Sequence, residues 1–457
     1  MKSLFPPNFN WAIFILVALI LRVTYLDLST IGYIAILLSL YQFALLFDAI
    51  GHFIPVRYLL GSFMCVQFFV GPALAYNGLD QYQYFMYKMK IPEIEYFSYA
   101  IPAVLAFIVG LHLFAGSLKG ETVDEKRIEI FVQNNPKLPY TFIIVGFLAS
   151  IISGFFSTEL AFVFYLLGSF KFIGLFLLIF GSKQLKILPM VLVIGSIVSS
   201  SLGEGMFHDL LTWIIFTGAI FAIKYKISFK IKLIGASAFI FIVLTIQLLK
   251  GSYRTVIGKE GEEGGVETFA NLYEQQNKDN SLFNFKSLAQ SNVRINQGFI
   301  ITNIMTTVPE VEPFSNGEEM YKVVEAAILP RILAPNKLKA GDREIFFKYS
   351  HITLRQGTSM GLSSLGDAYI NFGVGGGVVF MFFLGLLYGG VLNAFQKNSK
   401  DYPVLILFTA LVFYYPIRPD CELQTILGHL VKSVFLIFVM ISVWKYTFYV
   451  PRKLALK

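Results

Sequence analysis

The chain has 457 residues, of which 56% are hydrophobic and only 14% are charged, and its formal net charge is +8. A chain of this length and apolar content is not a soluble domain. Much of the positive excess lies in short loops between apolar runs, where it orients a membrane protein and does not indicate nucleic-acid binding. The two cysteines, Cys65 and Cys421, predict neither a disulfide framework nor a metal cluster.

Apolar runs of about 20 residues, the length needed to cross a hydrocarbon core of roughly 30 Å, recur along the chain. Backbone groups in lipid must be hydrogen-bonded within the protein, and the runs lack the alternation of a barrel, so we expect helices. Twelve spans are predicted: Phe9–Tyr25, Ile31–Phe47, Tyr58–Tyr76, Phe97–Ala115, Tyr140–Phe156, Leu160–Phe180, Leu185–Leu202, Leu210–Ile223, Leu233–Leu249, Tyr369–Ala394, Val404–Ile417 and Ile426–Tyr449. The predicted fold class is an all-α polytopic membrane protein with one integral membrane domain: residues 1–250 carry nine helices, residues 251–366 form a large loop, and residues 367–457 carry three helices.

Loop charge predicts the orientation. With the N-terminus inside, thirteen basic residues fall in short inner loops and three in short outer loops, so the positive-inside rule places both termini in the cytoplasm. The inner residues are Arg57, Lys119, Lys126, Arg127, Lys137, Lys183, Lys186, Lys224, Lys226, Lys230, Lys232, Lys397 and Lys400, and the outer ones are Lys88, Lys90 and Arg418. The segment from Gly251 to Gly366 is then outside, together with Glu204, His208, Asp209 and Asp420.

This outer segment is the long hydrophilic stretch of the chain, and its pattern predicts helices over Val266–Gln276, Ser287–Thr307 and Phe314–Leu329. In the second of these, Ile295, Phe299, Ile300 and Ile304 recur at helical spacing and form an apolar face. We expect the segment to pack as a cap on the outer ends of the helices.

Arginines are the first candidates for chemistry. The outer segment holds Arg254, Arg294, Arg331, Arg343 and Arg355, and Arg418 lies near the outer end of a span. Guanidinium groups bind phosphate oxygens through paired hydrogen bonds and stay charged at physiological pH, so the group predicts a diphosphate site at the bilayer surface. The alternative is that each arginine snorkels, pairs with an acidic residue or contacts lipid head groups.

Acid–base candidates also fall on the outer side. Glu204 and His208 are four residues apart, a spacing that puts both on one face of a helix, and a carboxylate could orient the imidazole as a base. His351 and Arg355 have the same spacing. The alternatives are a solvated turn for the first pair and surface packing for the second. No metal-binding motif and no nucleotide-binding glycine motif is present, so neither a metal nor a cofactor is predicted.

Two blocks of the chain resemble a known family. The run Pro309…Pro313-Phe314…Gly317 followed by Ile328-Leu329-Pro330-Arg331-Ile332-Leu333-Ala334-Pro335-Asn336-Lys337, and the run Gly366-Asp367-Ala368-Tyr369-Ile370-Asn371-Phe372-Gly373 before a Gly-rich span, are similar to Wzy-type oligosaccharide repeat-unit polymerases. These belong to the superfamily of O-antigen polymerases and ligases. The similarity covers roughly Arg254 to Tyr388.

The resemblance implies a metal-independent membrane glycosyltransferase with a GT-C-like fold. It implies undecaprenyl-diphosphate-linked glycans as donor and acceptor, a periplasmic site on the bacterial inner membrane, and a chain-length regulator as a partner. The arginines would then hold the diphosphate, and Glu204, His208 or His351 would remove the acceptor's proton.

Two other functions stay open at this point. A ligase would transfer a finished glycan to a lipid or protein acceptor, as in lipopolysaccharide assembly. A transporter of lipid-linked glycan belongs to a different class, and many charges along its central helices and short loops are expected there, whereas Lys171 is nearly alone here and one loop is long.

Overall fold

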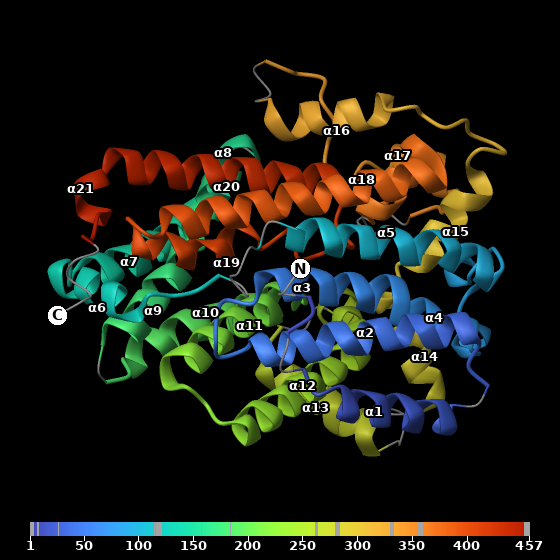
Figure 1. Cartoon of the computed structure of the whole chain (residues 1–457), viewed down its shortest axis with the longest axis horizontal. Helices are drawn as coiled ribbons and strands as arrows, with labels where there is room; N and C mark the ends of the chain where they lie inside the picture. Colours follow the sequence, from blue (N-terminus) through green and yellow to red (C-terminus); the bar gives the residue numbers. More distant parts are fainter. Residues whose placement is uncertain are drawn as a thin grey trace.

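The computed structural model of the chain describes residues 4–6, 9–25, 27–113, 115, 121–156, 158–182, 184–260, 264–278, 284–329, 333–354 and 360–451. Over these residues the protein is helical and contains no strand, with one isolated bridge between Ile54 and Glu121. Long helices run side by side along the longest axis of the molecule (Figure 1). The predicted all-α polytopic class is confirmed.

Nine helical segments among the described residues are long and apolar enough to cross a membrane. They contain α2 (Thr30–Ala49), α3 to α4 (Val56–Tyr76), α5 (Glu93–Leu113), α7 (Leu138–Ile152), part of α8 with α9 (Phe162–Gly181), α10 (Ile187–Glu204), α12 (Phe229–Thr255), α18 (Ser363–Asn398) and α20 (Leu423–Val443). Each coincides with one of the twelve predicted spans.

The other three predicted spans are helical, but none of their helices is among the nine that are long and apolar enough to cross a membrane. Phe9–Tyr25 contains the 14-residue helix α1 (Trp11–Thr24), and Leu210–Ile223 lies within the 18-residue helix α11 (His208–Tyr225). Val404–Ile417 is divided between a 3-10 helix (Pro403–Phe408) and the short helix α19 (Thr409–Val412). A twelve-span topology therefore stays a prediction.

Glycines allow α5 and α18 to pack with their backbones almost touching. A Cβ atom built on Gly385 of α18 would lie 2.1 Å from the carbonyl oxygen of Phe107, and one on Gly110 of α5 would lie 2.2 Å from that of Phe382. Small residues at a helix–helix contact permit this approach, which drives packing where the surrounding solvent is itself apolar. The α5–α18 pair therefore forms a rigid centre for the bundle.

Buried charges join the helix ends at one end of the molecule. Arg57 forms a buried ion pair with Glu121 at 2.9 Å and donates to the Asn393 amide oxygen at 3.1 Å. Arg127 of α6 (Glu125–Asn134) donates to the carbonyl oxygen of Lys400 at 2.8 Å. All of these residues belong to loops or helix ends that the sequence places in the cytoplasm. Of the basic residues predicted there, Lys119 and Lys183 lie outside the described residues.

The outer segment folds into further helices at the opposite end, where α14 and α15 lie near α4 (Gly71–Tyr76) (Figure 1). They are α13 (Val266–Lys278), α14 (Phe285–Ile295), α15 (Gly298–Thr307), α16 (Glu318–Ile328) and α17 (Arg343–Ser350). The single helix predicted over Ser287–Thr307 is wrong, because the chain breaks at Asn296 and Gln297. There the Asn296 side chain accepts from Gly298 N at 2.8 Å, and Gln297 N donates to Gln67 O at 3.0 Å.

The Tyr369-to-Gly373 block joins α16 to α18. The Asn371 amide oxygen accepts from the Ser315 hydroxyl at 2.7 Å and from the Met320 amide at 3.0 Å. Gly373 adopts a positive φ of 64° that kinks α18, and a Cβ there would lie 3.3 Å from the Phe314 ring. These residues thus have a structural role, and Pro330, Arg331 and Ile332 of the other block lie outside the described residues.

Candidate functional site

The outer end of α12 presents two cations on one face. Lys250 and Arg254 are four residues apart on this helix, so their side chains lie one above the other. At about 1.5 Å per residue the 27 residues of α12 measure ~40 Å, which exceeds a hydrocarbon core of roughly 30 Å. The last turns of α12 therefore reach the depth of lipid head groups.

Two more cations converge on this helix end from distant parts of the sequence. Arg294 on α14 lies close enough to act electrostatically on Lys250 and to be acted on by Arg254. Arg418, in the turn between α19 and α20, and Asp420 also act on Lys250. Asp420 is held by the Gln67 side chain, whose nitrogen donates to its carboxylate at 3.3 Å. We call Lys250, Arg254, Arg294 and Arg418 the cationic cluster.

The cationic cluster has more positive charge than its surroundings neutralise. Within the described part of the chain, none of its four side chains forms an ion pair with an acidic residue within 4.0 Å. Burial, followed by the positive charge of Arg254, lowers the pKa of Arg294. Because like charges held together raise each other's energy, an anion bound among them would be stabilised. Although neighbouring groups cover part of Arg294, it remains exposed to solvent, as does Arg254, so such an anion has access.

The turn between α10 and α11 fixes the position of Arg254. The Nε atom of Arg254 donates to the carbonyl oxygen of Gly205 at 2.9 Å. Gly205 ends α10 with a φ of +62°, and a Cβ atom there would lie 3.0 Å from the Arg254 side chain. The Tyr253 hydroxyl donates to Leu202 O at 2.8 Å and attaches the same turn. Over the part of the chain that the structure describes, no hydrogen bond involves Nη1 or Nη2 of Arg254, so both atoms can bind a ligand.

His208 lies at the edge of this cluster, but its partner differs from the one predicted. Its Nε2 atom contacts the carboxylate of Asp209, and the charge of Arg418 reaches Asp209. The predicted pairing with Glu204 is wrong, because α10 ends at Glu204 and α11 begins at His208. The left-handed Gly205 between them removes the continuous helix on which four-residue spacing depends. Glu204 is exposed.

Another group of predicted residues lies on α17. Arg343 and His351, with Lys348 and Glu312, line a shallow surface pocket that shares no residue with the cationic cluster. His351 stacks on the Phe347 ring at 5.6 Å and ends α17 in a left-handed conformation. The structure thus divides the predicted residues into two groups, with Arg254, Arg294, Arg418 and His208 in the first. Arg331 and Arg355 lie outside the described residues.

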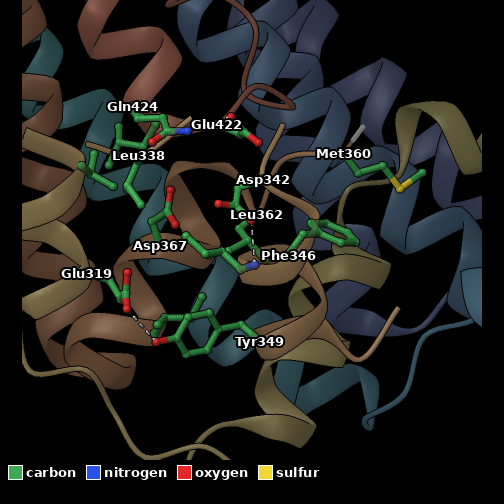
Figure 2. Close-up of a pocket in the computed structure, with 14 residues that line it drawn as sticks. Glu319, Leu338, Asp342, Phe346, Tyr349, Met360, Leu362, Asp367, Glu422 and Gln424 are labelled. Atoms are coloured by element: carbon green, nitrogen blue, oxygen red, sulfur yellow. Dashed lines mark hydrogen bonds between the residues drawn. The ribbon is translucent and has the colours of Figure 1, made fainter. Parts of the chain in front are cut away.

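A small acidic cavity lies between α16, α17, α18 and the start of α20. Figure 2 shows the side chains of Glu319, Asp342, Asp367 and Glu422 arranged around it. The carboxylate of Glu422 accepts from Gly341 N at 2.9 and 3.0 Å, and the Tyr349 hydroxyl donates to Glu319 at 3.5 Å. Glu422 is two residues after Asp420, so one short turn borders both the acidic cavity and the cationic cluster. Among the described residues, no three His, Cys, Asp or Glu side chains lie so that they could hold a metal ion, and this includes the four carboxylates of the cavity.

The sequence prediction missed three members of the site. Lys250 directly follows the predicted span that ends at Leu249, where a lysine is typical of a membrane boundary. Its spacing from Arg254 is the one signal that could have identified it. Asp209 and Asp420 were placed on the outer side without a role, because their partners come from other helices.

Comparisons with known proteins add no relative: no family model, no curated protein and no solved structure matches the chain. What the site can do therefore follows from its own chemistry. Four cations at the outer end of α12, next to a histidine whose ring contacts a carboxylate, can bind a di-anionic group and accept a proton beside it.

Proposed function

We propose that the protein is a membrane glycosyltransferase that polymerises oligosaccharide repeat units carried on undecaprenyl diphosphate. The observation that carries this proposal is the cationic cluster, in which Lys250, Arg254, Arg294 and Arg418 come together with no ion pair to an acidic residue among the described residues. The resemblance to Wzy-type polymerases supplies the reaction class, and the position of the cluster at the end of a long apolar helix suits a lipid-linked substrate.

In this reaction a hydroxyl oxygen of the incoming repeat unit attacks the anomeric carbon of the growing chain. The bond between that carbon and the diphosphate oxygen breaks, and undecaprenyl diphosphate leaves with the electron pair. The hydroxyl proton passes to a base on the protein. Because negative charge grows on the departing oxygen, cations held in place around it stabilise the transition state more than the bound substrate.

His208 is the base that fits best among the predicted candidates. Its contact with Asp209 orients the imidazole toward the cluster's edge and fixes which ring nitrogen is free to act as a base. Glu204 has no such partner among the described residues, and His351 lies in the α17 pocket with Arg343, away from the members of the cluster. Removing His208 is expected to slow transfer without preventing donor binding.

The location follows from the same proposal. We assign the Arg57 end of the bundle to the cytoplasm and the cationic cluster to the periplasmic face of the bacterial inner membrane, as loop charge predicts. The substrates arrive within the bilayer, already activated as diphosphates, so the protein needs no nucleotide. A chain-length regulator is the expected protein partner, by resemblance.

The test uses the full chain in lipid nanodiscs with a lipid-diphosphate-linked repeat unit, a chelator and no nucleotide. We expect a ladder of products that differ by one repeat unit. Arg254→Ala and Arg294→Ala should lower the rate by roughly 100-fold, the range seen when one positioned donor is removed from a developing anion. Arg343→Ala, in the other group, should keep the ladder.

The products distinguish the competing functions. Transfer of the glycan to a lipid or peptide acceptor without a ladder would identify a ligase, and movement of intact substrate across a bilayer would identify a transporter. A normal ladder from a folded Arg254→Ala, Arg294→Ala double variant would contradict the role of the cluster.

A further inference from the structure

An apolar face on α16 is exposed, although this helix belongs to the hydrophilic outer segment. Tyr321, Val324 and Ile328 follow one another at three and four residues, so they share one side of the helix. Tyr321 is 71% exposed and Ile328 is 56% exposed. The last charged residue of α16 is Glu325, and the three residues after it are apolar, with the Lys337 ammonium donating to the carbonyl oxygens of Ala326 and Leu329 at this helix end. A face of this kind in water is unusual and calls for a partner.

The position of α16 along α20 shows the depth of this face. Val323 lines the acidic cavity together with Gln424, and one turn later a Cβ built on Gly428 would lie 3.7 Å from the Cα of Ala327. The two helices therefore run in the same direction, side by side, as Figure 1 also shows. The polar N-terminal half of α16 lies beside the start of α20. The apolar C-terminal end of α16 packs beside α20 further along, toward the middle of the bundle.

The length of α20 can be compared with the thickness of a bilayer, which gives the depth of the α16 residues packed beside it. Its 21 residues measure ~31 Å, which matches a hydrocarbon core of roughly 30 Å, so Leu423 marks the outer boundary. Gly428 is five residues further along, or ~7.5 Å below that boundary at about 1.5 Å per residue. Ala327 and Ile328 are at the same depth.

The same face of α20 continues below α16 as a lipid-facing surface. Gly428, Val431 and Phe435 are spaced by three and four residues, so they lie on one stripe of the helix. Gly428 is covered by Ala327, whereas Val431 and Phe435 are exposed, Phe435 by 70%. The exposed Lys432 lies beside them, with its Nζ atom over the Phe162 ring and 4.0 Å from the Cβ position of Gly428. A membrane-spanning helix exposes residues such as Val431 and Phe435 to acyl chains. The apolar face of α16 is continuous with this surface.

We infer that the C-terminal half of α16 is inserted into the outer leaflet, and that lipid acyl chains are the partner of its Tyr321–Val324–Ile328 face. The outer segment is then anchored in the bilayer beside α20 and does not rest wholly on top of the helices. Its opposite side, with Val323 and Glu319, lines the acidic cavity, so a single helix separates lipid from that cavity. This inference is independent of the reaction that the protein catalyses.

The experiment measures the depth of a spin label attached to Ile328→Cys in full-length protein reconstituted in nanodiscs. Cys65 and Cys421, the two native cysteines, are first replaced by alanine and serine. Phe435→Cys serves as the control within the bilayer, and Val311→Cys, an exposed apolar position of the outer segment outside α16, serves as the control in water. Oxygen partitions into acyl chains and a charged nickel chelate stays in water.

We expect the ratio of oxygen to nickel accessibility at Ile328→Cys to resemble that of Phe435→Cys and to exceed that of Val311→Cys several-fold. A ratio equal to that of Val311→Cys would overturn the inference. Spin–spin broadening that disappears on dilution with unlabelled protein would also overturn it, since a second copy of the chain would then cover the face. Val324→Cys, at a 40% exposed position on the same face of α16, repeats the test if Ile328→Cys fails to fold.

Discussion

At the scale of single residues, Lys250 is the centre of the cationic cluster because all three arginines act on it. Lys250→Met keeps the length of the side chain and removes its charge. A hydrogen bond to a charged group contributes about 1.5–3 kcal/mol, so we expect diphosphate binding to weaken roughly 10- to 100-fold. Titration of the protein in nanodiscs with a short-chain prenyl diphosphate measures the change.

The control for this substitution is Lys278→Met. Lys278 is an exposed lysine of the outer segment that pairs with Glu274 at 2.6 Å on its own helix. The Lys278→Met variant should bind the diphosphate as tightly as the unmodified protein. Equal weakening in the two variants would mean that general surface charge attracts the ligand, and the cluster would have no special role.

The raised pKa of Glu422 makes the stability of the fold depend on pH. Burial is the main reason that the pKa of this carboxyl is raised, and Asp342 raises it further. The folded protein therefore holds a proton that the unfolded chain releases earlier. Its contribution to stability is present at low pH and is lost as pH rises through the folded-state pKa.

We expect Glu422→Gln to flatten this pH dependence. The melting temperature of the variant relative to the parent should rise between about pH 5 and about pH 8, because the parent must ionise a buried carboxyl and the variant does not. Thermal unfolding in detergent across this range measures the difference. A variant that loses stability relative to the parent as pH rises would show that the ionised form is favoured in the fold.

At the scale of elements, the contact between α5 and α18 depends on glycine. Gly385→Val places new atoms where a backbone oxygen already lies 2.1 Å from the Cβ position. Overpacking of a tight interface costs about 1–3 kcal/mol or more, so we expect a lower melting temperature and a lower yield of monodisperse protein. Gly195→Val on α10 is the matched control, because nothing lies within 4 Å of its Cβ position.

The helices that cross the membrane were the most predictable elements, because hydrophobicity and length alone determine them. The breaks were not predictable from local pattern. The stop between α14 and α15 depends on the carbonyl of Gln67, more than 200 residues earlier in the chain. Glu204 and His208 were paired by spacing, and the left-handed Gly205 separates them. The charged residues at the start of α16 likewise gave no indication that its last turn packs beside α20.

At the scale of the whole molecule, charged residues gather at two opposite ends, one around Arg57 and one around the cationic cluster. The proposed orientation puts the second end in the periplasm. In intact bacterial cells, a membrane-impermeant maleimide should therefore label Glu204→Cys and Lys348→Cys but leave Lys397→Cys unlabelled. Labelling of Lys397→Cys before the cells are opened would mean that the orientation is opposite to the proposed one.

The arrangement of charges was only partly predictable at this scale. Loop charge predicts Arg254, Arg294 and Arg418 on one side of the membrane, and the structure brings the three together near Lys250, but a side of a membrane is a broad surface. That Arg294 reaches α12 while Arg343 joins a separate pocket depends on the packing of α14 and α17, which the sequence alone does not specify.

The uncompensated positive charge of the cationic cluster has a consequence for turnover. Under the proposed function, the same four side chains would bind the diphosphate before the sugar departs and the spent carrier afterwards, so the reaction would be inhibited by its own product. We expect the polymerisation rate in sealed vesicles to decline as carrier accumulates, and a pyrophosphatase that hydrolyses the free carrier to restore it. Recycling of the carrier by a separate hydrolase would then set how fast the glycan grows.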